Sequence, residues 1–288
     1  MAGIFAEGTR FELVVQNNPY GSLANCWFQP LTHPSGNDVP ETSASSGTAK
    51  IQKICIFMQN LNLIMKKSWI LPACFLLIAA LVNFVARFIG AAPVAAMVKP
   101  ALLPLVALTT VAAMGSMEDK AVRRLVTAQL LGAAGDIFLI ASGTLPFAIG
   151  LGCFLAGHIF YFTVFGARSW KGLNPVQWVG IMAVMAAAVA GLLVGIGVKG
   201  AFLVPFAVYG LALMFLIWGG LAGVIRNIGN KGTWWIVTCG GVLFAFSDSL
   251  IAIQTFNGAS TFLEFLVMVT YVAAQCLLAW GGVRLIKK

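Results

Sequence analysis

The chain has 288 residues, of which 60% are hydrophobic and 9% are charged, and its formal net charge is +9. A soluble domain carries roughly 25% charged residues, so this composition excludes an ordinary water-soluble protein. The basic residues lie between apolar runs, where they can anchor loops to anionic headgroups, so the net charge does not indicate nucleic acid binding. The composition therefore predicts an integral membrane protein whose main partner is the lipid bilayer.

Residues 1–64 differ in composition from the rest of the chain. The segment 34–50 is rich in Ser, Thr, Gly, Pro and Asn and has no apolar periodicity, which predicts disorder. The N-terminus does not have the order of regions that defines a signal peptide. Met65 is followed by Lys66 and Lys67 and then by an apolar run, an arrangement typical of the start of a membrane protein. We therefore expect residues 1–64 to be a disordered or dispensable extension and residues 65–288 to form the transmembrane domain.

Apolar runs long enough to cross a hydrocarbon core of roughly 30 Å recur from residue 68 onward. Helices satisfy their own backbone in lipid, and the alternation of an outer-membrane barrel is absent from the sequence. The fold class predicted is thus all-α, a polytopic bundle of about eight transmembrane helices. The expected spans are 68–89, 94–116, 123–142, 145–166, 176–197, 201–224, 233–254 and 262–285.

The basic residues predict the orientation of this bundle. With a cytoplasmic N-terminus, twelve basic residues lie inside, and only Arg87 and Lys199 lie outside. The inner set is Lys66, Lys67, Lys120, Arg123, Arg124, Arg168, Lys171, Arg226, Lys231, Arg284, Lys287 and Lys288. By the positive-inside rule both termini are cytoplasmic, and we expect the protein in a bacterial inner (plasma) membrane.

The sequence also contains a weak internal repeat. Asp136 in the third span and Asp248 in the seventh coincide at an offset of 112 residues, which roughly superposes the first four spans on the last four. A four-plus-four duplication with parallel halves is therefore possible.

Charged and polar side chains inside apolar spans are costly and are functional candidates by default. At 1.5 Å per residue, Asp136, Asp248 and Lys99 each lie roughly 20 Å from the inner face, so they share one level in the outer half. His158 and Tyr161 share a face of the fourth span about 10 Å deeper. Tyr271 and Gln275, which are four residues apart, share one face of the eighth span.

Each of these residues also has a structural interpretation. Asp136 and Lys99 could form a purely structural ion pair, and His158 could be a hydrogen-bonded core histidine. Tyr161, Tyr271 and Gln275 could be ordinary interhelical hydrogen-bonding residues. Asp248, flanked by Ser247 and Ser249, is the hardest to explain structurally. Close helix packing accounts for Gly132 and Gly135.

The sequence disfavours a metal centre and a serine nucleophile. The two histidines are His33, in the polar N-terminal segment, and His158, so a three-histidine zinc site cannot be built. No GxSxG motif is present, and His158 is expected about 10 Å below Ser247. No metal or cofactor is therefore expected, and acid–base chemistry by carboxyl groups remains.

Five motifs in order resemble the YhhN-type lysoplasmalogenase family of eight-span membrane proteins. They are Lys99-Pro100 with Leu-Leu-Pro, Gly135-Asp136, Phe154-Leu-Ala-Gly-His158-Ile-Phe-Tyr161, Phe246-Ser247-Asp248-Ser249 and Tyr271-Val-Ala-Ala-Gln275. The resemblance covers about 66–288, and residues 1–64 have no counterpart in it. It implies hydrolysis of the vinyl ether bond of a lysoplasmalogen or a related lysolipid, with release of a fatty aldehyde.

Vinyl ether hydrolysis needs one protonated acid and one anion, as glycoside hydrolysis does. We expect Asp136 and Asp248 to be the catalytic pair, either of them being the acid. Lys99 could keep one carboxylate ionised or bind the lipid phosphate. The substrate-binding residues expected are Lys99, His158, Tyr161, Ser247, Tyr271 and Gln275. Two other functions stay open, a proton-coupled small-molecule transporter and a non-catalytic membrane scaffold; the sequence leaves the oligomeric state open.

Overall fold

The structure is a computed structural model that describes residues 68–166 and 172–287. The expected extension 1–64 and the start near Met65 lie outside these residues, as do Arg168 and Lys171. We describe only the unit that begins at Ser68, which is compact in itself.

The described residues fold into eight long helices and one short 3₁₀ turn, with no strand among them. The all-α prediction is therefore confirmed. The helix bounds differ from the expected spans by at most four residues, the largest difference being the end of the third helix at Phe138 instead of residue 142. The elements are α2 (Ile70–Phe88), α3 (Ala92–Met114), α4 (Lys120–Phe138), α5 (Thr144–Phe165), α6 (Pro175–Ile196), η1 (Gly200–Phe202), α7 (Leu203–Ile225), α8 (Lys231–Asn257) and α9 (Thr261–Ile286).

Seven of these helices are long and apolar enough to span a membrane, which makes the chain an integral membrane protein. The remaining helix, α4, is less apolar because it contains Lys120, Arg123, Arg124 and Asp136. Its 19 residues extend roughly 28 Å, close to the thickness of the hydrocarbon core. The three basic residues are exposed at its start, whereas Asp136 is buried near its end.

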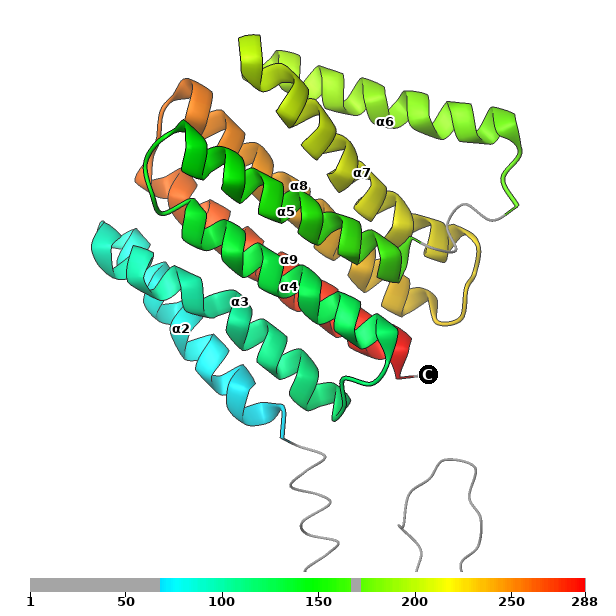
Figure 1. The fold of residues 1–288 in the computed structure, drawn as a ribbon, viewed down its shortest axis with the longest axis horizontal. Helices are drawn as coiled ribbons and strands as arrows, with labels where there is room; N and C mark the ends of the chain where they lie inside the picture. The colour runs from blue at the N-terminus through cyan, green and yellow to red at the C-terminus, as the bar shows by residue number, and fades with distance from the viewer. Residues whose placement is uncertain (1–67, 167–171, 288) are drawn as a thin grey trace, which may run out of the picture. The chain divides into compact units, whose positions relative to one another are not determined.

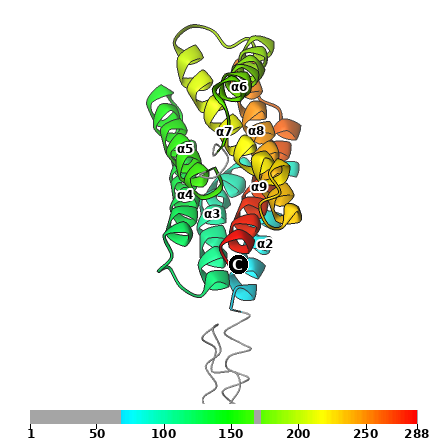
Figure 2. The ribbon, with the colours of Figure 1, turned by 90° about the vertical axis from the view of Figure 1, so that its right-hand side faces the viewer.

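Helix α9 lies in the middle of the bundle, where it packs against α2, α3, α4 and α8 (Figure 1). Helices α2 and α3 pair on one side of it, and α4 pairs with α5. Helix α6 packs mainly on α7 and α8, far from α2 and α3 in both views (Figure 2). The polar residues of α3, α4, α8 and α9 can therefore meet in the interior.

The possible four-plus-four duplication stays a prediction. In such a duplication α2 would correspond to α6, but these helices are placed differently. Helix α2 packs on the central α9, whereas α6 packs on α7 and α8.

Glycines let α4 approach its neighbours closely. A methyl group at Gly132 would come 2.5 Å from Leu103 Cδ2, and one at Gly135 would come 2.7 Å from the ring of Phe154. A methyl group at Gly157 of α5 would lie 3.0 Å from the carbonyl oxygen of Ala128. The close-packing interpretation of Gly132 and Gly135 is thus confirmed, and it explains how Phe154 reaches the surface of α4.

Candidate active site

Asp136 and Lys99 form a buried ion pair between α4 and α3. Lys99 Nζ lies 3.0 Å from Asp136 Oδ1, and the Asp136 side chain is only 2% exposed. Tyr271 of α9 donates a hydrogen bond of 2.8 Å to the other carboxylate oxygen, Oδ2. Both oxygens of Asp136 are therefore engaged, one by a cation and one by a phenol, which stabilises the ionised carboxylate.

Asp248 on α8 has a different environment. Tyr209 of α7 donates a short hydrogen bond to its Oδ2, and no lysine or arginine forms an ion pair with it among the described residues. The side chain of Asp248 is half-buried, because part of its surface faces a cavity. The two carboxyl groups interact electrostatically, and the charge of Lys99 also acts on Asp248. Asp248 is thus a carboxyl group beside an apolar space, without a cation bound to it.

The cavity lies between α5, α6, α7 and α8. Most of its wall is aliphatic or aromatic, with Leu192 and Leu193 from α6 and Phe206 and Leu213 from α7 as examples. Its polar side chains are Tyr209, Asp248 and Ser249. An apolar wall with a few polar groups at one place is typical of a ligand site for a molecule with a long hydrocarbon part.

Phe154 contacts both the cavity and the phenol that binds Asp136. Its ring forms part of the cavity wall and also packs edge to face on Tyr271, at 6.2 Å between ring centroids. Neither Asp136 nor Lys99 belongs to the wall of this cavity. The proposed joint action of Asp136 and Asp248 therefore stays a prediction, because Asp248 lines the cavity and Asp136 does not.

The sequence-predicted polar residues of α5 and α9 meet in pairs. Tyr161 donates a hydrogen bond of 2.5 Å to Gln275 Oε1, and both side chains are buried. Gln275 lies one helical turn from Tyr271, and both border Gly132. This group connects to the Asp136 ion pair, but it does not reach the cavity wall.

His158 and Ser247 are fully enclosed. The His158 ring lies 5.3 Å from the Tyr209 ring and 4.6 Å from the Phe244 ring, between centroids. It hydrogen-bonds the backbone of Phe154, and its Nε2 has no hydrogen-bond partner among the described residues. Ser247 donates to the carbonyl oxygen of Val267 at 3.0 Å, which suits a helix-packing role. His158 is placed beside the phenol that binds Asp248.

Sequence reasoning missed Tyr209. In an apolar span a single tyrosine resembles a packing residue, and no motif surrounds it. One observation could have found it. Three of the chain's four tyrosines lie in the expected spans, namely Tyr161, Tyr209 and Tyr271, and Tyr161 and Tyr271 were already candidates. A buried phenol needs a hydrogen-bond partner, which makes each such tyrosine a candidate for a buried acid.

The described residues contain no group of three or more His, Cys, Asp or Glu side chains placed to hold a metal ion. The chemistry that this arrangement can perform itself is proton transfer by a carboxyl group, next to a second carboxyl group that is paired with a lysine.

The sequence of this chain is similar to those of a protein family and of several proteins named lysoplasmalogenase. The YhhN family matches residues 94–282. Lysoplasmalogenase TMEM86A of Bos taurus is 29% identical over 163 residues, which cover 56% of this chain and 65% of the relative. Lysoplasmalogenase TMEM86B of Homo sapiens is 30% identical over 158 residues, or 54% of this chain and 62% of the relative.

A bacterial relative gives a similar result. The lysoplasmalogenase of Mycobacterium tuberculosis (strain CDC 1551 / Oshkosh) is 33% identical over 164 residues, which cover 55% of this chain and 60% of the relative. The chain thus spans about three fifths of the length of these relatives. No solved structure gives a significant match.

Proposed function

This chain belongs to the YhhN family, and we propose that it is a membrane lipid hydrolase that cleaves the vinyl ether bond of a lysoplasmalogen or a similar lysolipid. The observation that carries the proposal is the contrast between two neighbouring carboxyl groups. Asp136 is bound by Lys99 and Tyr271, whereas Asp248 faces an apolar cavity with only Tyr209 bound to it. The relatives named lysoplasmalogenase support the choice of substrate.

In the proposed reaction the two carboxyl groups have different roles, and Asp248 transfers the proton. Asp248 donates its proton to the vinyl carbon remote from the ether oxygen, and the double bond becomes an oxocarbenium ion. Water adds to the carbon next to the oxygen and returns a proton to Asp248. The resulting hemiacetal breaks into a fatty aldehyde and a glycerol hydroxyl group, so one water molecule is consumed for each bond cleaved.

Asp248 is the better candidate for the acid. A carboxyl group beside an apolar cavity, without a paired cation, is favoured in its neutral form. Asp136 is the better candidate for the anion, because Lys99 forms an ion pair with it and Asp136 interacts electrostatically with Asp248. A fixed negative charge near a developing oxocarbenium ion stabilises the transition state.

The cavity provides a place for the hydrocarbon chain next to the acid. Leu192, Leu193 and Leu213 line it, so an alkenyl chain would exchange lipid for an equally apolar wall. The vinyl ether at the end of that chain would then lie against Asp248 and Tyr209. His158, packed on the Tyr209 ring, is assigned a positioning role for this phenol.

The test is aldehyde release by the purified protein. It should release a long-chain aldehyde from 1-alkenyl-lysophosphoethanolamine and none from the saturated 1-alkyl analogue, which has no double bond to protonate. Asp248→Asn should abolish release while the protein remains folded. Absence of aldehyde from the wild-type protein would reject hydrolysis, and binding or exchange of the lipid without cleavage would favour the carrier function.

A further inference from the structure

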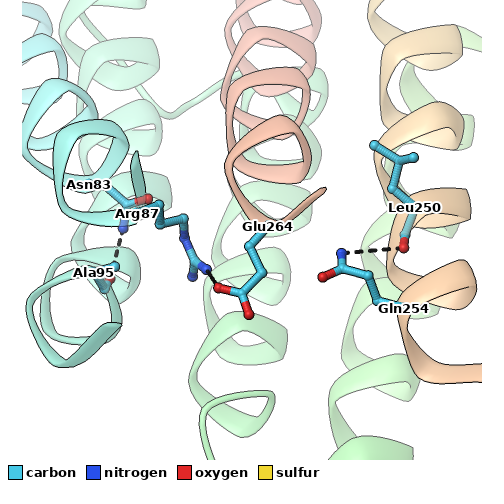
Figure 3. A network of polar contacts seen from close by, with 6 residues as sticks. All are labelled: Asn83, Arg87, Ala95, Leu250, Gln254 and Glu264. Atoms are coloured by element: carbon cyan, nitrogen blue, oxygen red, sulfur yellow. Dashed lines mark hydrogen bonds and ion pairs between the residues drawn. The ribbon is translucent and has the colours of Figure 1, made fainter. Parts of the chain in front are cut away.

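A second ion pair lies where α2 ends and α9 begins. Arg87, in the last turn of α2, places Nη1 2.8 Å from Oε2 of Glu264, in the first turn of α9. Figure 3 shows this pair with Asn83 one turn earlier on α2 and Gln254 of α8 extending toward Glu264. Both charged residues stand at helix ends, and in a membrane helix this is the level of the lipid headgroups.

One donor and one acceptor at this ion pair have no hydrogen-bond partner among the described residues. Arg87 Nε is buried and has no hydrogen-bond partner among the described residues, and the same is true of Asn83 Oδ1. The Asn83 amide group is fixed, because its Nδ2 donates to the carbonyl oxygen of Ala95 at 2.7 Å. The Arg87 side chain is 15% exposed and that of Glu264 is 41% exposed. A buried guanidinium with a free donor beside a partly open carboxylate can accept a ligand that carries both charges.

The pair lies near Tyr271 and Asp136 of the candidate site. Glu264 and Tyr271 lie seven residues apart on one face of α9, which separates them by roughly 10 Å along the helix. Arg87 is close enough for its charge to act on Asp136. In an extended lysophosphoethanolamine the phosphorus lies roughly 6 Å and the ammonium roughly 10 Å from the ether oxygen, counted by bond lengths.

We propose that Arg87 and Glu264 bind the zwitterionic headgroup of the lysolipid, with Arg87 on the phosphate and Glu264 on the ammonium group. This inference rests on the proposed function. Arginine suits phosphate because its planar guanidinium offers several donors at once, and Nε is available for this contact. The headgroup would replace the mutual ion pair by two ion pairs with the ligand.

The test compares two substrates that differ only in the headgroup, 1-alkenyl-lysophosphoethanolamine and 1-alkenylglycerol. The main variant is the double substitution Arg87→Gln with Glu264→Gln, which leaves no unpaired charge and should fold as the wild-type protein does. For the phospholipid, KM should rise roughly 10- to 100-fold with kcat little changed, as expected for lost charge-assisted hydrogen bonds. For the glycerol ether, KM should stay within about twofold of the wild-type value.

Glu264→Gln alone separates the two halves of the headgroup. It should remove the preference for lysophosphoethanolamine over 1-alkenyl-lysophosphatidic acid, which has the phosphate and lacks the ammonium group. Glu118→Gln is the matched control for Glu264→Gln, because Glu118 is exposed in the loop before α4 and its loss makes the same change in net charge. Equal losses on both substrates would mean a structural role for the pair and would overturn the proposal, as would unchanged kinetics.

A binding experiment keeps the result independent of hydrolysis. The 1-alkyl-lysophosphoethanolamine cannot be cleaved, and its binding to detergent-solubilised protein can be measured by the shift in Tm. The wild-type protein should be stabilised by this lipid and the double variant should not. If the lipid stabilises only the wild-type protein and no substrate releases aldehyde, the hydrolase is rejected and the headgroup site is kept. If aldehyde is released and the lipid stabilises both proteins equally, the headgroup site is rejected and the hydrolase is kept.

Discussion

Phe154 packs edge to face against Tyr271, and the same Phe154 ring closes the cavity beside Asp248. Tyr271 in turn hydrogen-bonds Asp136, so Phe154 contacts both the cavity and a partner of the ion pair. In the proposed reaction, Asp248 acts by contact with the substrate and Asp136 by its charge. Substitutions at the two positions should give different defects.

Asp248→Asn should lower kcat by about 10²–10⁴-fold, because asparagine keeps the shape of the side chain and cannot donate the proton. Tyr209→Phe should be milder, since it removes one hydrogen bond and keeps the acid. Aldehyde release and Tm are measured for each variant. An Asp248→Asn protein that keeps a tenth of the wild-type rate would show that another group supplies the proton.

Lys99→Gln should destabilise the protein by roughly 3–5 kcal/mol, because it leaves the buried Asp136 carboxylate without its cation. Combining it with Asp136→Asn removes both charges and should restore much of that stability. Activity should stay low in the double variant, since the anion is absent. Thermal unfolding and aldehyde release from the same preparations check the two effects, and recovery of full activity together with stability would exclude a catalytic anion at Asp136.

Leu192→Trp should narrow the cavity and shift the substrate preference toward shorter alkenyl chains. Leu192 lines the cavity from α6 and is 42% exposed, so a larger side chain can be accommodated without disturbing the core. Val194→Trp on the same helix is the control, because Val194 is 81% exposed. The kcat/KM values for lysoplasmalogens with different chain lengths are compared, and the same shift in both variants would place the hydrocarbon chain elsewhere.

The distribution of basic residues predicts cytoplasmic termini. A reporter that is active only outside the cytoplasm should stay silent when it is fused after Lys288. The same reporter inserted beside Lys199, between α6 and α7, should be active. The reverse pattern would mean that the bundle is inverted and that the headgroup pair faces the cytoplasm.

The helices could be predicted from the sequence because eight apolar runs are separated by short polar or glycine-containing segments. The level of Asp136 and Lys99 could also be predicted, because the rise per residue of a helix is constant. Counting residues from opposite faces of the membrane places Asp136 and Lys99 at one depth, and in the structure they form an ion pair of 3.0 Å. The depth of a residue in a membrane helix thus follows from the sequence.

The rotation of each helix about its own axis does not follow from the sequence in the same way. Helices such as α7 are apolar on all sides, so no polar face indicates that Tyr209 points to α8. The same reason explains why the sequence, which places Asp136 and Asp248 at one depth, does not show that Asp248 lines the cavity and Asp136 does not. The cavity depends on how four helices pack together, and no local pattern records this.

The ion pair of Lys99 with Asp136 has a further consequence for the proposed reaction, whose product is an aldehyde. A free lysine amine adds to an aldehyde carbonyl and forms a Schiff base, which would inactivate the protein with its own product. The Lys99 nitrogen is engaged by the Asp136 carboxylate at 3.0 Å, and Lys99 does not line the cavity. We therefore expect the aldehyde of the proposed reaction to leave through the hydrocarbon phase without modifying Lys99.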